Sequence, residues 1–150
     1  MLFRSVGDGP EMKNLTALAE ERGLHNVAFV GSVPSDQLGK WYADADILIV
    51  NLRGESAFDH ALPSKLFEYM AAKKPILFGG NGPGADVVRE ANAGIVVPPD
   101  NPDAMAEALR TLVLNPEKAL EYGRDGYHHV VKYYRREVIL ERVTTFFDSL

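Results

Sequence analysis

One short run, Asp46-Ile47-Leu48-Ile49-Val50, limits the fold of this chain more than any other feature of its sequence. Successive side chains of a strand point to opposite faces, so this run would make both faces apolar. Strands of this kind are typical of parallel sheets covered by helices on both sides, because antiparallel sheets usually leave one face in water. The run therefore predicts an α/β fold with a buried parallel sheet.

Short apolar runs alternate with amphipathic stretches along the rest of the 150 residues. Further strands are predicted at about 3–6, 27–30, 74–78 and 94–97. Helices are predicted at about 11–22, after 35, from 63, and at about 85–92, 102–114, 116–133 and 136–149. This alternation predicts a single doubly wound domain over residues 1–150, with a Rossmann-like parallel sheet.

The composition narrows the class of protein. Apolar residues make up 46% of the chain and charged residues 25%, which is ordinary for a globular domain. The net charge of −5 argues against a nucleic-acid partner, which requires a basic face. The absence of cysteine excludes a disulfide scaffold and a thiolate metal site, and the histidines and carboxylates lack the spacing of metal ligands. No apolar run approaches the roughly 20 residues of a membrane span.

The segment Pro63–Met70 has the strongest chemical pattern, and it follows a predicted central strand, where open parallel sheets bind ligands. Pro63 suits the first position of a helix, and the free amides after it favour an anion. Lys65 adds a positive charge, and Glu68 lies one turn from Ser64 on the same face. This arrangement suits a phosphate joined to a sugar with vicinal hydroxyls, as in a nucleoside diphosphate.

A purely structural interpretation of the same residues stays open. Ser64 would be an ordinary N-cap, Lys65 a solvated charge and Glu68 part of an exposed helix face. A capping box would need a glutamate three residues after Ser64, and Phe67 stands there. Glu68 is therefore available for another partner.

Five ordered segments resemble the C-terminal half of a GT-B glycosyltransferase of family 4, and the resemblance runs over nearly the whole chain. These segments are Val6–Glu11, Val27–Pro34, Tyr42–Asp46, Pro63–Ala71 and Ala93–Val97. The resemblance implies a retaining transferase that moves a sugar from a nucleotide-sugar donor, expected to be a UDP-sugar, to a cell-surface polysaccharide or lipid-linked acceptor. No cofactor beyond this co-substrate is implied. The expected location is cytoplasmic, at the inner face of the membrane in the full-length protein.

The resemblance also implies roles for single residues. Glu68 matches the glutamate that accepts hydrogen bonds from the ribose hydroxyls, and Lys65 would offset charge on the leaving diphosphate. The other matched positions contact the nucleotide through the helix start (Ser64, Leu66), the loop at the base (Ser32, Val33) and a turn lining the cleft (Gly7, Gly9). For the two glycines, a turn without a binding role is an equal alternative.

One position departs from the family pattern. Many members carry a second glutamate eight residues before the ribose glutamate, and this chain has His60 there. As an imidazolium, His60 would favour a phosphate dianion or contact the sugar; the alternative is a solvated loop residue. Further candidates for donor-sugar contacts lie in the same long loop: Arg53, Glu55 and Asp59.

Parts of the family's enzyme are expected to lie outside this chain: the first strand and helix of this half, and the N-terminal domain with the acceptor site. In the strand order 3-2-1-4-5-6 the missing strand is central, so strands two and four would each have an open edge. Such edges would also allow a homo-oligomer. The last helix carries an apolar stripe that either packs on the N-terminal domain or closes this domain's own core: Ile139, Val143, Phe146, Phe147 and Leu150.

Two other functions stay open. A non-catalytic module would bind a nucleotide-sugar and work with a partner chain that supplies the missing strand and the acceptor domain. A GT-B nucleotide-sugar epimerase is the other, although the family-4 spacing of Pro63–Glu68 disfavours it. If the chain is the donor-binding half of a glycosyltransferase, we expect it to bind nucleotide by itself but to transfer no sugar.

Overall fold

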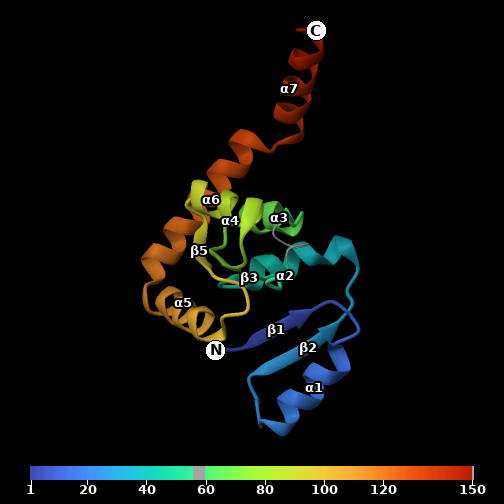
Figure 1. The fold of residues 1–150 in the computed structure, drawn as a ribbon, viewed down its shortest axis with the longest axis vertical. Helices are drawn as coiled ribbons and strands as arrows, with labels where there is room; N and C mark the ends of the chain where they lie inside the picture. Colours follow the sequence, from blue (N-terminus) through green and yellow to red (C-terminus); the bar gives the residue numbers. More distant parts are fainter. Residues whose placement is uncertain (56–59, 150) are drawn as a thin grey trace. The chain divides into compact units, whose positions relative to one another are not determined.

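The computed structural model describes residues 1–55 and 60–149. The chain divides into two compact units, Met1–Trp41 and Tyr42–Leu150. In the first unit, strands β1 (Phe3–Val6) and β2 (Val27–Gly31) form a parallel pair joined by helix α1 (Met12–Glu21) (Figure 1). A short 3-10 turn, Ser35–Gln37, then leads into helix α2 (Leu38–Asp44).

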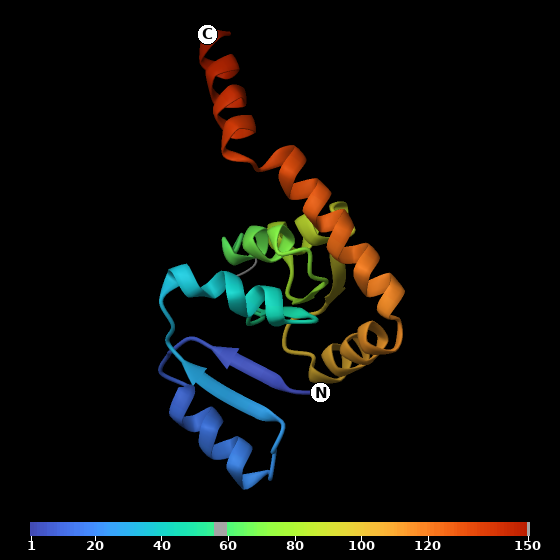
Figure 2. The same cartoon turned by 180° about the vertical axis from the view of Figure 1, so that it is seen from behind.

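The second unit contains a three-stranded parallel sheet in the order β3-β4-β5. Its strands are β3 (Leu48–Asn51), β4 (Ile76–Gly79) and β5 (Gly94–Val97). Its helices are α3 (Lys65–Ala71), α4 (Gly82–Glu90), α5 (Pro102–Leu114), α6 (Pro116–Tyr133) and α7 (Arg136–Asp148). Helix α7 continues from the end of α6 and leads away from the sheet (Figure 2).

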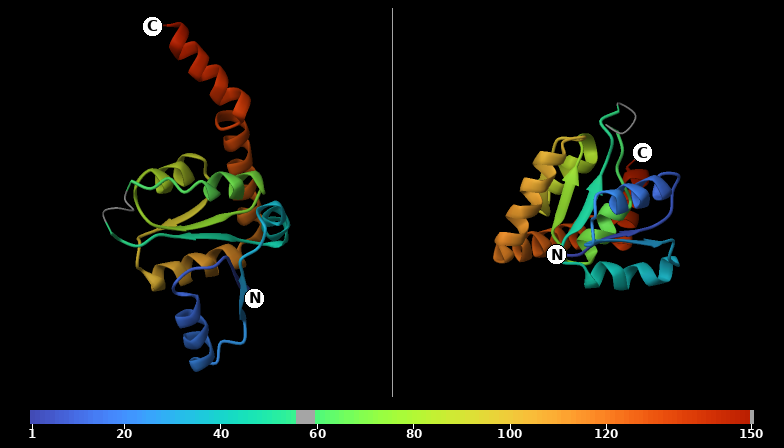
Figure 3. Two further views of the ribbon diagram at one scale, coloured as in Figure 1. Left: turned by 90° about the vertical axis from the view of Figure 1, so that its right-hand side faces the viewer. Right: turned by 90° about the horizontal axis from the view of Figure 1, so that it is seen from below.

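Helices cover both faces of the three-stranded sheet, as the apolar run in the sequence predicts. On one face, the fully buried side chains of Ile76 and Phe78 pack with residues of α3 and α4. On the other face, Leu77 packs with residues of α5 (Figure 3). Helix α6 contributes to both clusters, through Val130 and Ala119.

Two glycines of the second unit allow its backbone segments to pack closely against one another. A Cβ atom on Gly94 would overlap the carbonyl oxygen of Ile76 in the neighbouring strand. A Cβ atom on Gly123 would overlap the carbonyl oxygen of Lys73, which follows α3. Only glycine therefore lets β5 and α6 lie where they do, and the hydrophobic pattern of the sequence does not reveal this.

The first unit is less buried. Ala19 is its single buried apolar residue, and both Phe3 and Arg4 of β1 are exposed. Arg4 is an unusual residue for a parallel strand, and its guanidinium lies 5.9 Å from the centroid of the Trp41 ring. A cation above an indole face is an attractive arrangement, which accounts for a charged side chain in this strand.

Most predicted boundaries agree with the structure within two residues, and one helix start differs by three. The helix predicted from Pro63 begins at Lys65, and the helix predicted near residue 85 begins at Gly82. The earlier start of α4 follows from Pro83, whose fixed φ suits the first turn of a helix.

The predicted open edges are present in the described residues. Strand β1 pairs only with β2, and β3 pairs only with β4. Open parallel edges leave backbone groups available for pairing with another strand.

The apolar stripe on α7 does not close the core of this chain, so that alternative is wrong. No described residue of α7 is buried. The side chains of the stripe keep between 44% and 65% of their surface exposed: Ile139, Val143, Phe146 and Phe147. Leu150, the fifth predicted member of the stripe, lies outside the described residues.

Candidate functional site

Helix α3 presents Lys65 and Glu68 on its exposed side, directly after the loop that leaves the carboxyl end of β3. The opposite side of the helix is anchored in the core, where Leu66 and Met70 are fully buried. Phe67 adds a contact with Tyr134, with ring centroids 4.5 Å apart. The buried side fixes the helix, and the two charged side chains therefore stand at a defined place on the sheet edge.

The start of α3 differs from the sequence prediction in its hydrogen bonds. Pro63 precedes the helix, and its carbonyl accepts the Leu66 amide at 3.0 Å. The Phe67 amide donates to the carbonyl of Ser64 at 3.2 Å. The expectation of a free Leu66 amide is therefore wrong: this amide is paired, and the Leu66 side chain belongs to the core.

Ser64 occupies the N-cap position, but its side chain makes no capping hydrogen bond. The alternative that Ser64 acts as an ordinary N-cap through its side chain is therefore wrong. Ser64 and Lys65 remain as the exposed polar residues at this helix start.

Glu68 has a partner that the sequence analysis did not identify. The Tyr42 hydroxyl, at the end of α2, donates a hydrogen bond of 2.9 Å to Oε2 of Glu68. Burial, together with the hydrogen bond to Glu68 and its negative charge, raises the pKa of Tyr42 to about 12. The two residues are 26 positions apart, so no local spacing in the sequence joins them.

Two further contacts organise the carboxyl edge of the three-stranded sheet. Asp100, which follows β5, accepts the Gly54 amide at 2.7 Å and so connects the loops after β5 and β3. A Cβ atom on Gly84 would lie 2.8 Å from the Phe78 ring and 3.2 Å from Pro63. The glycine-rich turn predicted at 79–84 therefore lets α4 begin close beside the segment that leads into α3.

The predicted residues of the first unit meet at the carboxyl edge of its strands. The Gly7 amide donates to the Gly31 carbonyl at 2.8 Å, which brings the loops after β1 and β2 together. Gly7 has a φ of 136°, a conformation that residues with a side chain rarely adopt. Ser32 is exposed and Val33 half-buried in the second of these loops.

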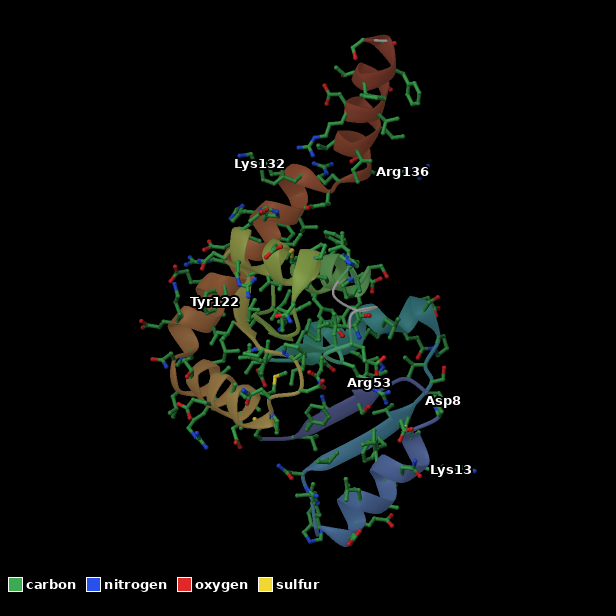
Figure 4. All side chains as sticks on the ribbon, in the orientation of Figure 1. Asp8, Lys13, Arg53, Tyr122, Lys132 and Arg136 are labelled. Carbon is green, nitrogen blue, oxygen red and sulfur yellow. The ribbon has the colours of Figure 1, made fainter. Side chains whose placement is uncertain are left out.

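Gly9 lies in a turn that has its own local explanation. The side chain of Asp8, labelled in Figure 4, accepts the Gly9 amide at 2.8 Å. No atom outside the turn lies within 4 Å of a Cβ placed on Gly9, and its φ is not in the left-handed region. A turn without a binding role therefore accounts for Gly9 as fully as a nucleotide contact does.

The remaining candidates lie in the loop between β3 and α3. His60 is exposed in a turn, and Arg53 lies 3.8 Å from Glu55 in an exposed ion pair. Asp59 lies outside the described residues. Across residues 1–55 and 60–149, no group of three or more histidines and carboxylates is placed to hold a metal ion. None of the described helices combines the length and apolar character needed to cross a bilayer.

A sequence model of the family described as glycosyl transferases group 1 matches residues 2–129. The chain belongs to this family. The match extends from β1 through most of α6, and it contains every predicted site residue.

Relatives of this glycosyl transferases group 1 chain have been named as sugar transferases. The GDP-mannose-dependent alpha-(1-6)-phosphatidylinositol monomannoside mannosyltransferase of Mycobacterium tuberculosis is 28% identical over 144 residues, which are 94% of this chain and 37% of the relative. The D-rhamnosyltransferase WbpZ of Pseudomonas aeruginosa is 31% identical over 127 residues, which are 81% of this chain and 31% of the relative. The chain thus spans less than two fifths of either protein.

Solved glycosyltransferase structures share the fold. HepE of Anabaena in complex with UDP matches with a TM-score of 0.86 at 18% identity, over 99% of this chain and 41% of the solved chain. The corresponding share of the solved chain is 37% for sucrose-phosphate synthase. Sucrose-phosphate synthase of Thermosynechococcus elongatus matches with a TM-score of 0.82 at 23% identity, also over 99% of this chain. The predicted fold class, a Rossmann-like α/β fold of the GT-B type, is confirmed.

Proposed function

We propose that this chain is the donor-binding part of a retaining glycosyltransferase of family 4. The complete enzyme would move a sugar from a nucleoside diphosphate donor to a cell-surface polysaccharide or lipid-linked acceptor, at the cytoplasmic face of the membrane. The observation that carries the proposal is the placement of Lys65 and Glu68, which stand exposed on α3 after the carboxyl end of β3. A cation and a carboxylate one turn apart at this edge match the two halves of a nucleoside diphosphate.

Each group has a chemical task in this proposal. The ammonium of Lys65, with the Ser64 hydroxyl and backbone beside it, takes the diphosphate and offsets the charge that develops on it as the sugar leaves. The Glu68 carboxylate accepts hydrogen bonds from the ribose hydroxyls. His60, exposed in the preceding loop, contacts the donor sugar or a phosphate. The loops carrying Gly7 and Ser32 contact the base through their backbones.

Measuring the binding of different nucleoside diphosphates would identify the base of the donor. Uracil is the base expected from the family resemblance, and HepE of Anabaena was solved with UDP. The mannosyltransferase of Mycobacterium tuberculosis is named as GDP-mannose-dependent. UDP and GDP are therefore the two probes, and UDP is the expected ligand.

The proposed enzyme also requires a further strand and an acceptor domain. An additional strand from outside this chain pairs with an open sheet edge, and an acceptor domain packs on the exposed stripe of α7. The alternative is a non-catalytic module whose partner chain supplies both parts. A sugar-transfer assay of the full-length gene product, with its mass measured by light scattering, tests this: one long chain that is active by itself supports the enzyme, and activity only with a second chain supports the module.

Lys65→Ala is expected to weaken UDP binding about 5-fold, because an exposed charge pair contributes roughly 1 kcal/mol. Binding of uridine, which carries no phosphate, is expected to stay unchanged. Isothermal titration calorimetry measures both ligands. Lys13→Ala is the matched control, since Lys13 is an exposed lysine on α1. Equal effects of the two substitutions on UDP binding would contradict the role of Lys65.

A further inference from the structure

The contact between Tyr42 and Glu68 joins two residues of the second unit at the proposed nucleotide site. The phenol oxygen of Tyr42 lies 2.9 Å from Oε2 of Glu68. This is the single side-chain hydrogen bond that Glu68 makes within the described part of the chain. The contact leaves Oε1, and one acceptor position on Oε2, available for a ligand.

Packing fixes the phenol, whereas the carboxylate is exposed. Tyr42 is half-buried, and its ring meets the Tyr69 ring edge-on, with centroids 5.1 Å apart and planes at 71°. Glu68 is an exposed side chain with several rotatable bonds. Ordering a free glutamate side chain costs up to about 2 kcal/mol of conformational entropy. A fixed donor beside it would reduce this cost before a ligand arrives.

The phenol acts as a donor at any pH near neutrality. Burial first, and then the hydrogen bond and charge of Glu68, together raise the pKa of Tyr42 to about 12. A tyrosine in this state stays protonated and donates its hydrogen to the carboxylate. The carboxylate stays the acceptor, as the ribose hydroxyls of a nucleotide require.

We infer that Tyr42 is a positioning residue for Glu68: its hydroxyl holds the carboxylate in the orientation that accepts hydrogen bonds from the vicinal hydroxyls of a ribose. This inference rests on the proposed function, because it takes Glu68 to be the ribose acceptor. It adds a residue on α2 to a site whose other predicted members on this unit lie in or next to α3. The opposite possibility is that the phenol competes with the ribose for the carboxylate.

The test compares UDP with 2′,3′-dideoxyuridine diphosphate by calorimetry, and GDP with its dideoxy counterpart in parallel. Wild-type protein is expected to prefer the ribonucleotide about 10-fold or more, since the hydroxyls bind a charged acceptor. Tyr42→Phe is expected to reduce this preference about 3- to 10-fold while the affinity for the dideoxynucleotide stays unchanged. A loss of general structure would weaken both ligands equally, so the ratio separates positioning from folding.

The two controls separate the possible failures. Glu68→Gln should remove most of the preference, and Tyr122→Phe, on α6 (Figure 4), should leave it unchanged. If Glu68→Gln keeps the full preference, or wild-type protein binds neither nucleotide, the proposed function is wrong and the inference falls with it. If Glu68→Gln loses the preference but Tyr42→Phe keeps it, only the inference is overturned. Tighter ribonucleotide binding by Tyr42→Phe would show competition and would also overturn it.

Discussion

Glu68→Ala is expected to weaken UDP binding by about 10- to 100-fold, because hydrogen bonds to a charged group contribute roughly 1.5–3 kcal/mol. The substitution removes the acceptor proposed for the ribose hydroxyls and leaves the Tyr42 hydroxyl without its partner. Calorimetry with UDP measures the change.

The folded structure is expected to tolerate this substitution, since Glu68 is exposed and its helix is anchored by Leu66 and Met70. The urea midpoint should therefore stay close to that of wild-type protein. Glu21→Ala, at an exposed position on α1, provides the control for a lost surface charge. The same UDP affinity in wild-type protein and in Glu68→Ala would rule out Glu68 as the ribose acceptor.

Gly94→Ala is expected to destabilise the second unit by roughly 4 kcal/mol or more, which is a large effect for one substitution. The added Cβ would overlap the backbone carbonyl oxygen of Ile76 on β4. Adding a methyl group to a packed core usually costs about 1–3 kcal/mol, because neighbouring side chains move aside. Here the neighbour is a backbone atom in the middle of the sheet, so the strands themselves would have to separate.

Urea unfolding followed by circular dichroism measures this loss. Gly39→Ala is the matched control, because no atom outside its own helix lies within 4 Å of a Cβ at that exposed position on α2. Alanine is favoured over glycine in a helix by about 1 kcal/mol, so the control should be neutral or slightly stabilising. Equal unfolding midpoints for the two variants would mean that β5 does not lie against β4 as described.

Most of the fold follows from local patterns in the sequence. The run Asp46–Val50 predicts a strand buried on both faces, and the structure places helices on both sides of the sheet that contains it. The stripe on α7 shows the limit of such patterns. Its periodicity identifies an apolar face but not the surface that covers it, and both alternatives had the same sequence signal.

The details of the candidate site depend on contacts between distant residues. The position of Lys65 and Glu68 on the helix that follows the carboxyl end of β3 could be predicted from the order of strands and helices. The pairing of Glu68 with Tyr42, and that of Asp100 with Gly54, joins residues 26 and 46 positions apart. The paired Leu66 amide arises because the chain turns at Pro63 before the helix begins. No single-residue propensity predicts these three features.

The proposed function depends on binding of a nucleoside diphosphate at the start of α3. An NMR titration of the ¹⁵N-labelled full chain with UDP, repeated with GDP, tests it most directly because each backbone amide reports separately. If this binding occurs, saturable shifts are expected for the amides of Ser64, Lys65 and Glu68, together with those of the loops after β1 and β2. Binding that leaves the amides of residues 64–68 unshifted, or no binding of either nucleotide at millimolar concentration, would contradict it.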